Sequence, residues 1–233
     1  MELSVLIPVY NEEENIGQTL SAVRQALEGE GITDFEIVVV DDGSTDSTIK
    51  TIGKHGQVKI VSHSVNRGLG AAIRTGVAAC NGDVILTYDS DLSYDATYLP
   101  RLIRAIRTCD AVTCSPYTSG GRVIGINILR LLLSRVISAV YSLLTGAKLS
   151  CFTSMCRAYK SAVLRAVAIE FDGFESQAEI MAKLALKGYE IREIPASLRV
   201  RLRGYSKFKT LKVMVRHLGL LLFLVRLRIE GVH

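Results

Sequence analysis

Val84-Ile85-Leu86-Thr87-Tyr88-Asp89-Ser90-Asp91-Leu92 is an apolar run that ends in two carboxylates, two residues apart. The apolar part is typical of a buried strand, and residues i and i+2 of an extended chain point the same way, so Asp89 and Asp91 can converge. Carboxylates that close repel each other unless one is protonated or a cation lies between them. A hard divalent cation, which often shares its ligand shell with substrate phosphates, is the natural candidate. Because an isolated D-x-D is more often a solvated turn, the site needs support from the rest of the chain.

Apolar runs and helical stretches alternate along the first half of the chain. The runs at about 3–9, 35–40, 58–61, 83–88 and 111–114 predict strands. Helices are predicted at about 11–28, with Asn11 as the N-cap, and at about 70–80 and 96–107. Such alternation indicates an α/β fold, in which a mostly parallel sheet carries helices on both faces.

Polar side chains follow three of the predicted strands. These are the motifs Tyr10-Asn11-Glu12, Asp41-Asp42 and Asp89-Ser90-Asp91. Ligands of open parallel sheets bind at the carboxyl ends of the strands, so we expect the three motifs to form one site.

The glycines of Asn66-Arg67-Gly68-Leu69-Gly70 do not complete a dinucleotide-binding motif. The third glycine of G-x-G-x-x-G would fall at Ile73, and the chain contains no P-loop. We interpret the glycines as a tight turn that lets a helix start close to the ligand.

Charge is divided unevenly along the 233 residues. Residues 1–100 hold 15 acidic and 6 basic side chains, whereas residues 101–233 hold 8 acidic and 22 basic ones. The first part is suited to hold a cation and the second to meet anions. We expect no signal peptide and no membrane-spanning segment, since the longest late apolar run is 218–225. The five cysteines form no C-x-x-C pair, which indicates reduced thiols.

Two segments of the second half combine apolar and basic residues. Residues 122–146 follow the joint Gly120-Gly121 and predict an amphipathic helix, either packed on the protein or lying in a membrane interface. A final helix is expected at about 207–228. Residues 192–228 hold ten Lys or Arg and one Glu, interleaved with Leu, Val and Phe. This pattern suits an anionic membrane surface better than nucleic acid, so no nucleic-acid partner is expected.

The segment between these two regions predicts a return to the sheet. Residues 153–159 are expected to rejoin it, a helix at 174–186 carries Glu175 and Glu179 on one face, and strands follow at 189–195 and 197–202. We expect that helix face to be exposed.

Taken together, four motifs resemble the successive signatures of family 2 glycosyltransferases with the GT-A fold, a Rossmann-like fold of nucleotide-diphospho-sugar transferases. They are Pro8-Val9-Tyr10-Asn11-Glu12, Asp41-Asp42-Gly43-Ser44-Thr45-Asp46, Asn66-Arg67-Gly68-Leu69-Gly70 and Asp89-Ser90-Asp91-Leu92-Ser93.

The second half resembles the polyprenyl-phosphate and dolichyl-phosphate sugar transferases of that family, among them the mannosyltransferases. The residues that carry this resemblance are Gly125, Arg130, Ser134, Arg135, Thr153-Ser154, Arg157-Ala158-Tyr159, Arg201, Gly204, Ser206 and Lys207. Met155-Cys156 and Ile126 depart from the family pattern, in which Gly-Phe and a tryptophan are common.

The resemblance implies a metal-dependent, inverting glycosyltransferase that uses Mg²⁺ or Mn²⁺. It would move a hexose, mannose or glucose, from a nucleotide-diphosphate sugar such as GDP-mannose to a polyprenyl or dolichyl phosphate. Asp89 and Asp91 would be catalytic and would hold the metal with Ser93. The residues implied for the nucleotide sugar are Pro8, Tyr10, Glu12, Asp42 and Arg67. The residues implied for the acceptor phosphate are Arg130, Ser134, Arg135, Arg157, Arg201, Ser206 and Lys207.

Two alternatives remain open from the sequence. A hydroxyl acceptor would need a carboxylate base, for which Glu179 and Glu175 are the first candidates. A catalytically silent partner protein that docks on membranes is the other, although such a protein has no need to keep two repelling carboxylates.

The resemblance also predicts the organisation of the chain. Residues 1–212 would form the GT-A domain, with a nucleotide-sugar half at 1–115 and an acceptor half at 116–212, and 213–233 would lie on the membrane surface. The protein is expected on the cytoplasmic face of a membrane, as a peripheral protein, with or without a membrane anchor subunit.

Overall fold

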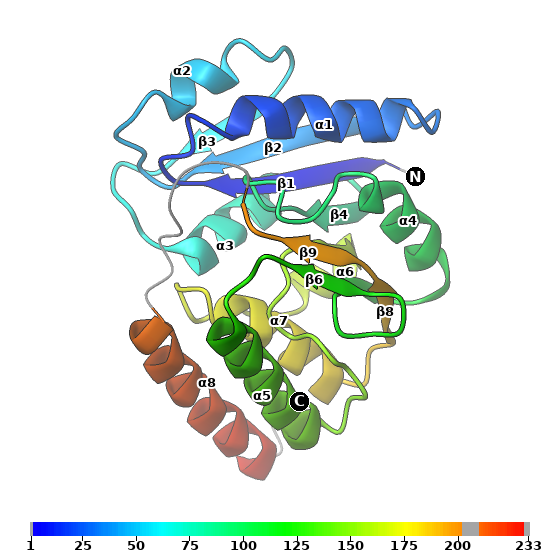
Figure 1. The fold of residues 1–233 in the computed structure, drawn as a ribbon, viewed down its shortest axis with the longest axis vertical. Coiled ribbons are helices and arrows are strands. Elements are labelled where there is room, and N and C mark those ends of the chain that lie inside the picture. The colour runs from blue at the N-terminus through cyan, green and yellow to red at the C-terminus, as the bar shows by residue number, and fades with distance from the viewer. Residues whose placement is uncertain (1, 202–209, 231–233) are drawn as a thin grey trace.

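A seven-stranded sheet forms the centre of the molecule, in the order β3-β2-β1-β4-β7-β5-β8 (Figure 1). The computed structural model describes residues 2–201 and 210–230. Paired strands run parallel, except that β7 is antiparallel to β4 and β5. The strands of this sheet are β1 (Leu3–Val9), β2 (Phe35–Asp41), β3 (Lys59–Ser62), β4 (Val84–Thr87), β5 (Ala111–Ser115), β7 (Arg157–Lys160) and β8 (Ile191–Pro195).

Helices cover both faces of the sheet. They are α1 (Ile16–Glu28), α2 (Thr48–Ile52), α3 (Leu69–Ala79), α4 (Tyr98–Ala105) with the 3-10 turn η1 (Ile106–Thr108), α5 (Ile128–Thr145), α6 (Ser161–Arg165), α7 (Ser176–Leu186) and α8 (Thr210–Glu230). Side chains of β1 alternate between two cores: Val5 and Ile7 pack with α1 and α4, and Leu6 packs with α3. The predicted α/β fold, a mostly parallel sheet with helices on both faces, is confirmed.

The first helix begins later than the sequence predicted. It starts at Ile16, and Asn11 has a left-handed backbone with φ 52°. The Asn11 side chain accepts a hydrogen bond from Thr45 N at 2.7 Å, and Asn11 N donates to Ser44 Oγ at 2.8 Å. The prediction of Asn11 as an N-cap is therefore wrong, because this residue joins the loop after β1 to the loop after β2.

Residues 122–146 are not one helix. Strand β6 (Arg122–Ile124) pairs in parallel with β9 (Ser197–Arg199), and the two form a separate two-stranded sheet. Gly125 then turns the chain with φ 72°, and the Asn127 side chain caps α5 by accepting from Leu129 N. The predicted helix therefore starts six residues too early, because its first residues are used in strand pairing.

Helices α5 and α8 lie side by side at one end of the molecule (Figure 1). Tyr141 of α5 and His217 of α8 are buried between them, with the Tyr141 hydroxyl 2.9 Å from His217 Nδ1. Among the described residues, α5 is the one helix long and apolar enough to cross a membrane, by length and composition. The sequence analysis described this segment as an amphipathic helix and did not count it as long and apolar enough to span.

Glycine is required at position 70 by a close approach of two backbones. A Cβ added there would lie 1.9 Å from the carbonyl oxygen of Phe171, and Gly70 N donates to Asp172 O at 2.7 Å. The sequence analysis attributed the glycines to close approach of a ligand. In the structure, Gly70 instead packs closely against the loop before α7.

We expect Gly70→Ala to lower the free energy of unfolding by roughly 2–3 kcal/mol, because the backbone at Phe171 would have to move. Gly219→Ala is the control, since an added Cβ on that exposed face of α8 meets no atom within 4 Å. It should be neutral or stabilising by up to about 1 kcal/mol. Urea unfolding followed by circular dichroism measures both, and equal stability of Gly70→Ala and the wild type would contradict this packing.

Candidate active site

The carboxylate pair lies on a turn just past the end of β4. The strand ends at Thr87, and Leu92 closes the turn with φ 55°. Thr19 Oγ1 donates to Ser90 O at 2.7 Å, and Thr87 Oγ1 donates to Met155 O at 2.7 Å. The pair thus follows the strand, as the sequence indicated, but residues 90–92 form a turn and not the extended backbone from which the convergence of Asp89 and Asp91 was inferred.

The two carboxylates are close enough to affect each other's charge. Burial and the neighbouring Asp91 carboxylate raise the pKa of Asp89 to about 8, while Arg130 and Arg157 act in the opposite direction. Ser93 lies beside the pair, and its backbone N donates to Asp91 Oδ1 at 3.0 Å. Ionising both carboxylates is unfavourable without a cation between them, and carboxylate oxygens are suitable ligands for a hard divalent cation such as Mg²⁺ or Mn²⁺.

The protein alone does not complete a metal cage in the part of the chain that the structure describes. Within residues 2–201 and 210–230, no group of three His, Cys, Asp or Glu side chains could hold a metal ion. A cation at Asp89 and Asp91 would therefore need ligands from water or from a substrate, as Mg²⁺ commonly does.

Arg201 brings a distant carboxylate to the pair. Its Nη2 atom lies 2.6 Å from Glu12 Oε1 and 3.6 Å from Asp91 Oδ2. Glu12 is 8 % exposed, and its other oxygen accepts from Asn15 Nδ2 at 2.8 Å. Arg201, which follows β9, thus contacts a carboxylate from the loop after β1 and lies near one from the loop after β4.

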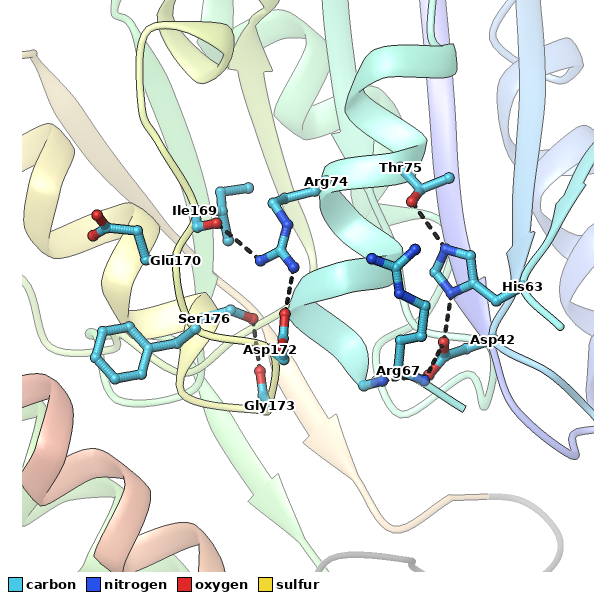
Figure 2. A network of polar contacts seen from close by, with 12 residues as sticks. Asp42, His63, Arg67, Arg74, Thr75, Ile169, Glu170, Asp172, Gly173 and Ser176 are labelled. Carbon is cyan, nitrogen blue, oxygen red and sulfur yellow. Dashed lines mark hydrogen bonds and ion pairs between the residues drawn. The ribbon is translucent and has the colours of Figure 1, made fainter. Parts of the chain in front are cut away.

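Asp42 lies beyond β2 and accepts three hydrogen bonds (Figure 2). Arg67 N donates to Oδ1 at 2.9 Å, Gly68 N donates to Oδ2 at 2.8 Å, and His63 Nδ1 lies 2.6 Å from Oδ1. The sequence analysis named Asp42 and Arg67 but missed His63, since a single histidine after an edge strand belongs to no motif. Arg67 contributes its backbone here, and its side chain is exposed.

Two other residues predicted for the nucleotide sugar, Pro8 and Tyr10, lie at the end of β1. Pro8 is buried in the strand, and Tyr10 is half-buried just beyond it. Asp42 N donates to Val9 O at 2.8 Å, so the ends of β1 and β2 remain paired at this point.

The residues predicted for an acceptor phosphate take different positions. Arg130 is exposed in the first turn of α5 and acts on the charge of Asp89. Ser134 Oγ lies 3.0 Å from Thr153 Oγ1, and Arg135 lies over the ring of Tyr117, 5.4 Å from its centroid. Ser206 and Lys207 lie outside the described residues.

Arg157 is inside the protein and its guanidinium is used by the fold. It is fully buried, and Nη2 donates to Phe152 O and Nη1 to Gln177 O, both at 2.7 Å. Nε donates to Thr113 Oγ1 at 3.3 Å, and Nη1 also donates to Tyr159 OH at 3.2 Å. The prediction that Arg157 binds the acceptor phosphate is therefore wrong, because its donors are bound within the core.

Glu175 and Glu179 are buried, which contradicts the expected exposed helix face. Glu179 accepts from the backbone N of Glu170 and Phe171, at 2.8 and 3.0 Å, and pairs with Lys183 at 2.6 Å. Glu175 accepts from Gly173 N at 3.2 Å and lies 3.9 Å from Arg216 of α8. Both carboxylates therefore stabilise the loop before α7.

Comparison with protein families identifies the largest part of the chain. The family model described as "Glycosyl transferase family 2" matches residues 4–168. A dolichol-phosphate mannosyltransferase from Pyrococcus furiosus is 32 % identical over 226 residues, covering 94 % of this chain and 63 % of the relative. An undecaprenyl-phosphate mannosyltransferase from Micrococcus luteus is 31 % identical over 217 residues, covering 89 % and 87 %.

Further relatives extend these similarities. An undecaprenyl-phosphate 4-deoxy-4-formamido-L-arabinose transferase from Edwardsiella ictaluri is 29 % identical over 224 residues, and this chain spans 64 % of its length. A glucosyl-3-phosphoglycerate synthase from Mycobacterium tuberculosis, solved with Mn²⁺, UDP and glucosyl-3-phosphoglycerate, superposes with a TM-score of 0.74 at 22 % identity. That match covers 96 % of this chain and 79 % of the solved one. At this identity it supports the fold alone.

The buried role of Arg157 predicts a large loss of stability on substitution. We expect Arg157→Met to lower the free energy of unfolding by about 3 kcal/mol, because two buried carbonyls would lose their donor. Arg107→Met removes the same charge from an exposed side chain and should change stability by less than about 0.5 kcal/mol. Thermal unfolding compares the two, and a small effect at Arg157 would contradict the structural role.

The raised pKa of Asp89 makes the stability of the metal-free protein depend on pH. Since its folded value of about 8 lies above the unfolded value of about 3.9, the free energy of unfolding should fall between about pH 4 and pH 8. We expect Asp89→Asn, which carries no charge, to be more stable than the wild type at pH 8.5 by roughly 1 kcal/mol or more.

Added Mn²⁺ should then stabilise the wild type at pH 8.5 and not Asp89→Asn. Asp95→Asn is the control, because it removes a carboxylate from the same loop and should leave the Mn²⁺ effect intact. Thermal melts with chelator or Mn²⁺ measure these shifts, and identical pH profiles for Asp89→Asn and the wild type would refute the account.

Proposed function

The chain belongs to glycosyl transferase family 2, and on that premise we propose that it transfers a hexose, mannose or glucose, from a nucleotide-diphosphate sugar to a polyprenyl or dolichyl phosphate. The proposal rests on a cluster of opposite charges at one edge of the sheet. Its carboxylates are Asp89, Asp91 and Glu12, and its guanidinium groups belong to Arg130 and Arg201. Such a site offers carboxylates for a cation and guanidinium groups for phosphate. The names of the three relatives, which specify prenyl phosphates, support this acceptor.

On the donor side, the loops after β1 and β2 would hold the nucleoside. Asp42 and Glu12 provide acceptors for ribose hydroxyls or base N–H groups. Pro8 is near the end of β1, Tyr10 follows that strand, and Arg67 lies on the loop after β3, where its backbone N donates to Asp42. Mg²⁺ or Mn²⁺, held by Asp89 and Asp91 with Ser93 nearby, would neutralise the departing diphosphate as a Lewis acid. The solved neighbour of the same fold binds Mn²⁺ and UDP, and these are therefore the first ligands to test here.

On the acceptor side, a phosphate oxygen is already a nucleophile. It needs cations for binding and no strong base, and Arg130 and Arg201 are described cations beside the carboxylate pair. Ser134, which contacts Thr153, stays a candidate from the sequence. Attack opposite the departing diphosphate would invert the anomeric carbon. Arg135, Ser206 and Lys207 stay candidates from the sequence.

A hydroxyl acceptor is less well supported by the contacts of the two candidate bases. Glu179 is fully buried and engaged by two amides and Lys183. Glu175 faces Gly173 and Arg216. A catalytically silent role is also disfavoured, since the protein keeps a carboxylate pair whose ionisation is costly.

The apolar outer faces of α5 and α8 support attachment to a membrane surface. Their exposed large hydrophobic residues are Ile128, Leu129, Leu132, Val136, Val140, Leu143, Val215, Leu218, Leu222, Val225 and Ile229. We propose that the protein acts on the cytoplasmic face of a membrane as a peripheral enzyme, with or without an anchor subunit. Residues 1–115 would then serve the donor, 116–212 the acceptor and 213–233 the membrane.

Transfer of label tests this function directly. Three labelled sugar nucleotides, GDP-mannose, UDP-glucose and UDP-N-acetylglucosamine, are offered with Mg²⁺ or Mn²⁺. We expect one of them to label polyprenyl phosphate and not polyprenol. Arg130→Ala should raise the KM for polyprenyl phosphate about tenfold or more, because one charge-assisted contact is lost, and slow donor hydrolysis should remain measurable. Lys187→Ala, an exposed charge at the end of α7, is the matched control.

Each other outcome would change the proposal. Labelling of polyprenol would move the acceptor to a hydroxyl. Absence of any donor turnover would favour the silent membrane-docking protein, and full activity of Arg130→Ala would remove this arginine from the acceptor site.

A further inference from the structure

An imidazole bridges the end of the sheet and the helix that follows it. His63 comes directly after β3, and its side chain is 6 % exposed. Its Nδ1 atom lies 2.6 Å from Asp42 Oδ1, and its Nε2 atom lies 2.9 Å from Thr75 Oγ1 on α3 (Figure 2). Both ring nitrogens are therefore engaged, and the ring cannot turn without breaking two contacts.

The acceptor chemistry of Asp42 determines where the imidazole carries its proton. An ionised carboxylate only accepts hydrogen bonds, so Nδ1 is the nitrogen that donates. In the neutral ring, Nε2 is then an acceptor, and the Thr75 hydroxyl donates to it. In that form Thr75 donates to His63 and His63 donates to Asp42; in a protonated ring Nε2 would donate to Thr75, and the bond from Nδ1 to Asp42 is the same in both forms.

This arrangement leaves little freedom to the Asp42 carboxylate. An ionised carboxylate has about four acceptor positions, and His63, Arg67 N and Gly68 N fill three of them. The side chain is 4 % exposed, and Asp42 N is tied to Val9 O. About one acceptor position remains, on Oδ2, because Oδ1 accepts from His63 and Arg67 N whereas Oδ2 accepts from Gly68 N.

We propose that His63, supported by Thr75, is a positioning residue that fixes Asp42 to read the nucleoside of the donor through its remaining acceptor position. This inference rests on the proposed function, in which Asp42 meets the nucleoside. The group read is an N–H or O–H donor on the base or the ribose. In the proposed function the diphosphate is held elsewhere, through a cation on Asp89 and Asp91, so loss of His63 should weaken nucleoside recognition and spare diphosphate recognition.

Calorimetric titration with UDP, GDP and inorganic pyrophosphate, each with Mn²⁺, separates these contributions. For the nucleotide that the wild type prefers, we expect His63→Leu to weaken binding about tenfold, because Asp42 loses one of its three fixed donors. Pyrophosphate binding should stay within about twofold. His63→Asn can still donate to Asp42 through its amide and should restore nucleotide affinity to within about threefold of the wild type.

A second pair of variants covers the case in which His63→Leu does not fold. Thr75→Val removes the hydroxyl and keeps the shape, and should weaken nucleotide binding several-fold, whereas Thr75→Ser keeps the hydroxyl and should not. His55→Leu is the matched control, since this histidine lies beside Ser21 of α1, away from Asp42.

Proton and nitrogen resonances of the imidazole give a readout independent of affinity. We expect the His63 ring to carry a proton on Nδ1, and its signals to shift when the preferred nucleotide is added but not with pyrophosphate. Unchanged nucleotide affinity in His63→Leu, or in Thr75→Val if the former is unfolded, would overturn the inference. So would an equal loss of nucleotide and pyrophosphate binding. Failure of the wild type to bind any nucleotide would contradict the proposed function itself.

Discussion

Repulsion between the Asp89 and Asp91 carboxylates explains why cationic side chains from distant segments gather beside β4. Arg130 from α5 and the buried Arg157 from β7 both lower the pKa that burial and Asp91 raise. Arg201, which follows β9, lies 3.6 Å from Asp91 and so opposes the same charge. These positive charges do not fully offset burial and the repulsion from Asp91, since the pKa of Asp89 is still about 8. A divalent cation with a bound diphosphate would supply what is missing.

The order of strands brings those cations to the carboxylates. Strand β7 comes from the basic half of the chain and lies antiparallel between β4 and β5, with Thr87 of β4 opposite Arg157. The pairing of β6 with β9 places α5 and Arg201 near the same edge. The acidic first half and the basic second half thus meet at one surface, which is the arrangement that joining two phosphate-bearing substrates requires.

Sequence patterns predicted the sheet and the loops that carry the site, because buried parallel strands are continuous apolar runs and their ends carry the polar motifs. They did not predict contacts made between loops. Asn11 was expected to cap a helix and instead binds Thr45, and Arg157 was expected to meet a ligand and instead holds the core. A charged residue looks the same in a sequence whether its partner is solvent, ligand or a distant carbonyl. His63 was missed for that reason, since its partners lie 21 and 12 residues away.

The most direct test of the central claim is electron–nuclear double resonance of Mn²⁺ bound to the protein with the preferred nucleoside diphosphate. If Asp89 and Asp91 hold a cation that also binds the diphosphate, the spectrum should show ³¹P coupling from directly bound phosphate, and Asp91→Asn should remove the bound Mn²⁺ signal. Bound Mn²⁺ without ³¹P coupling, or a signal unchanged in Asp91→Asn, would show that the carboxylate pair is not the place where metal and donor meet.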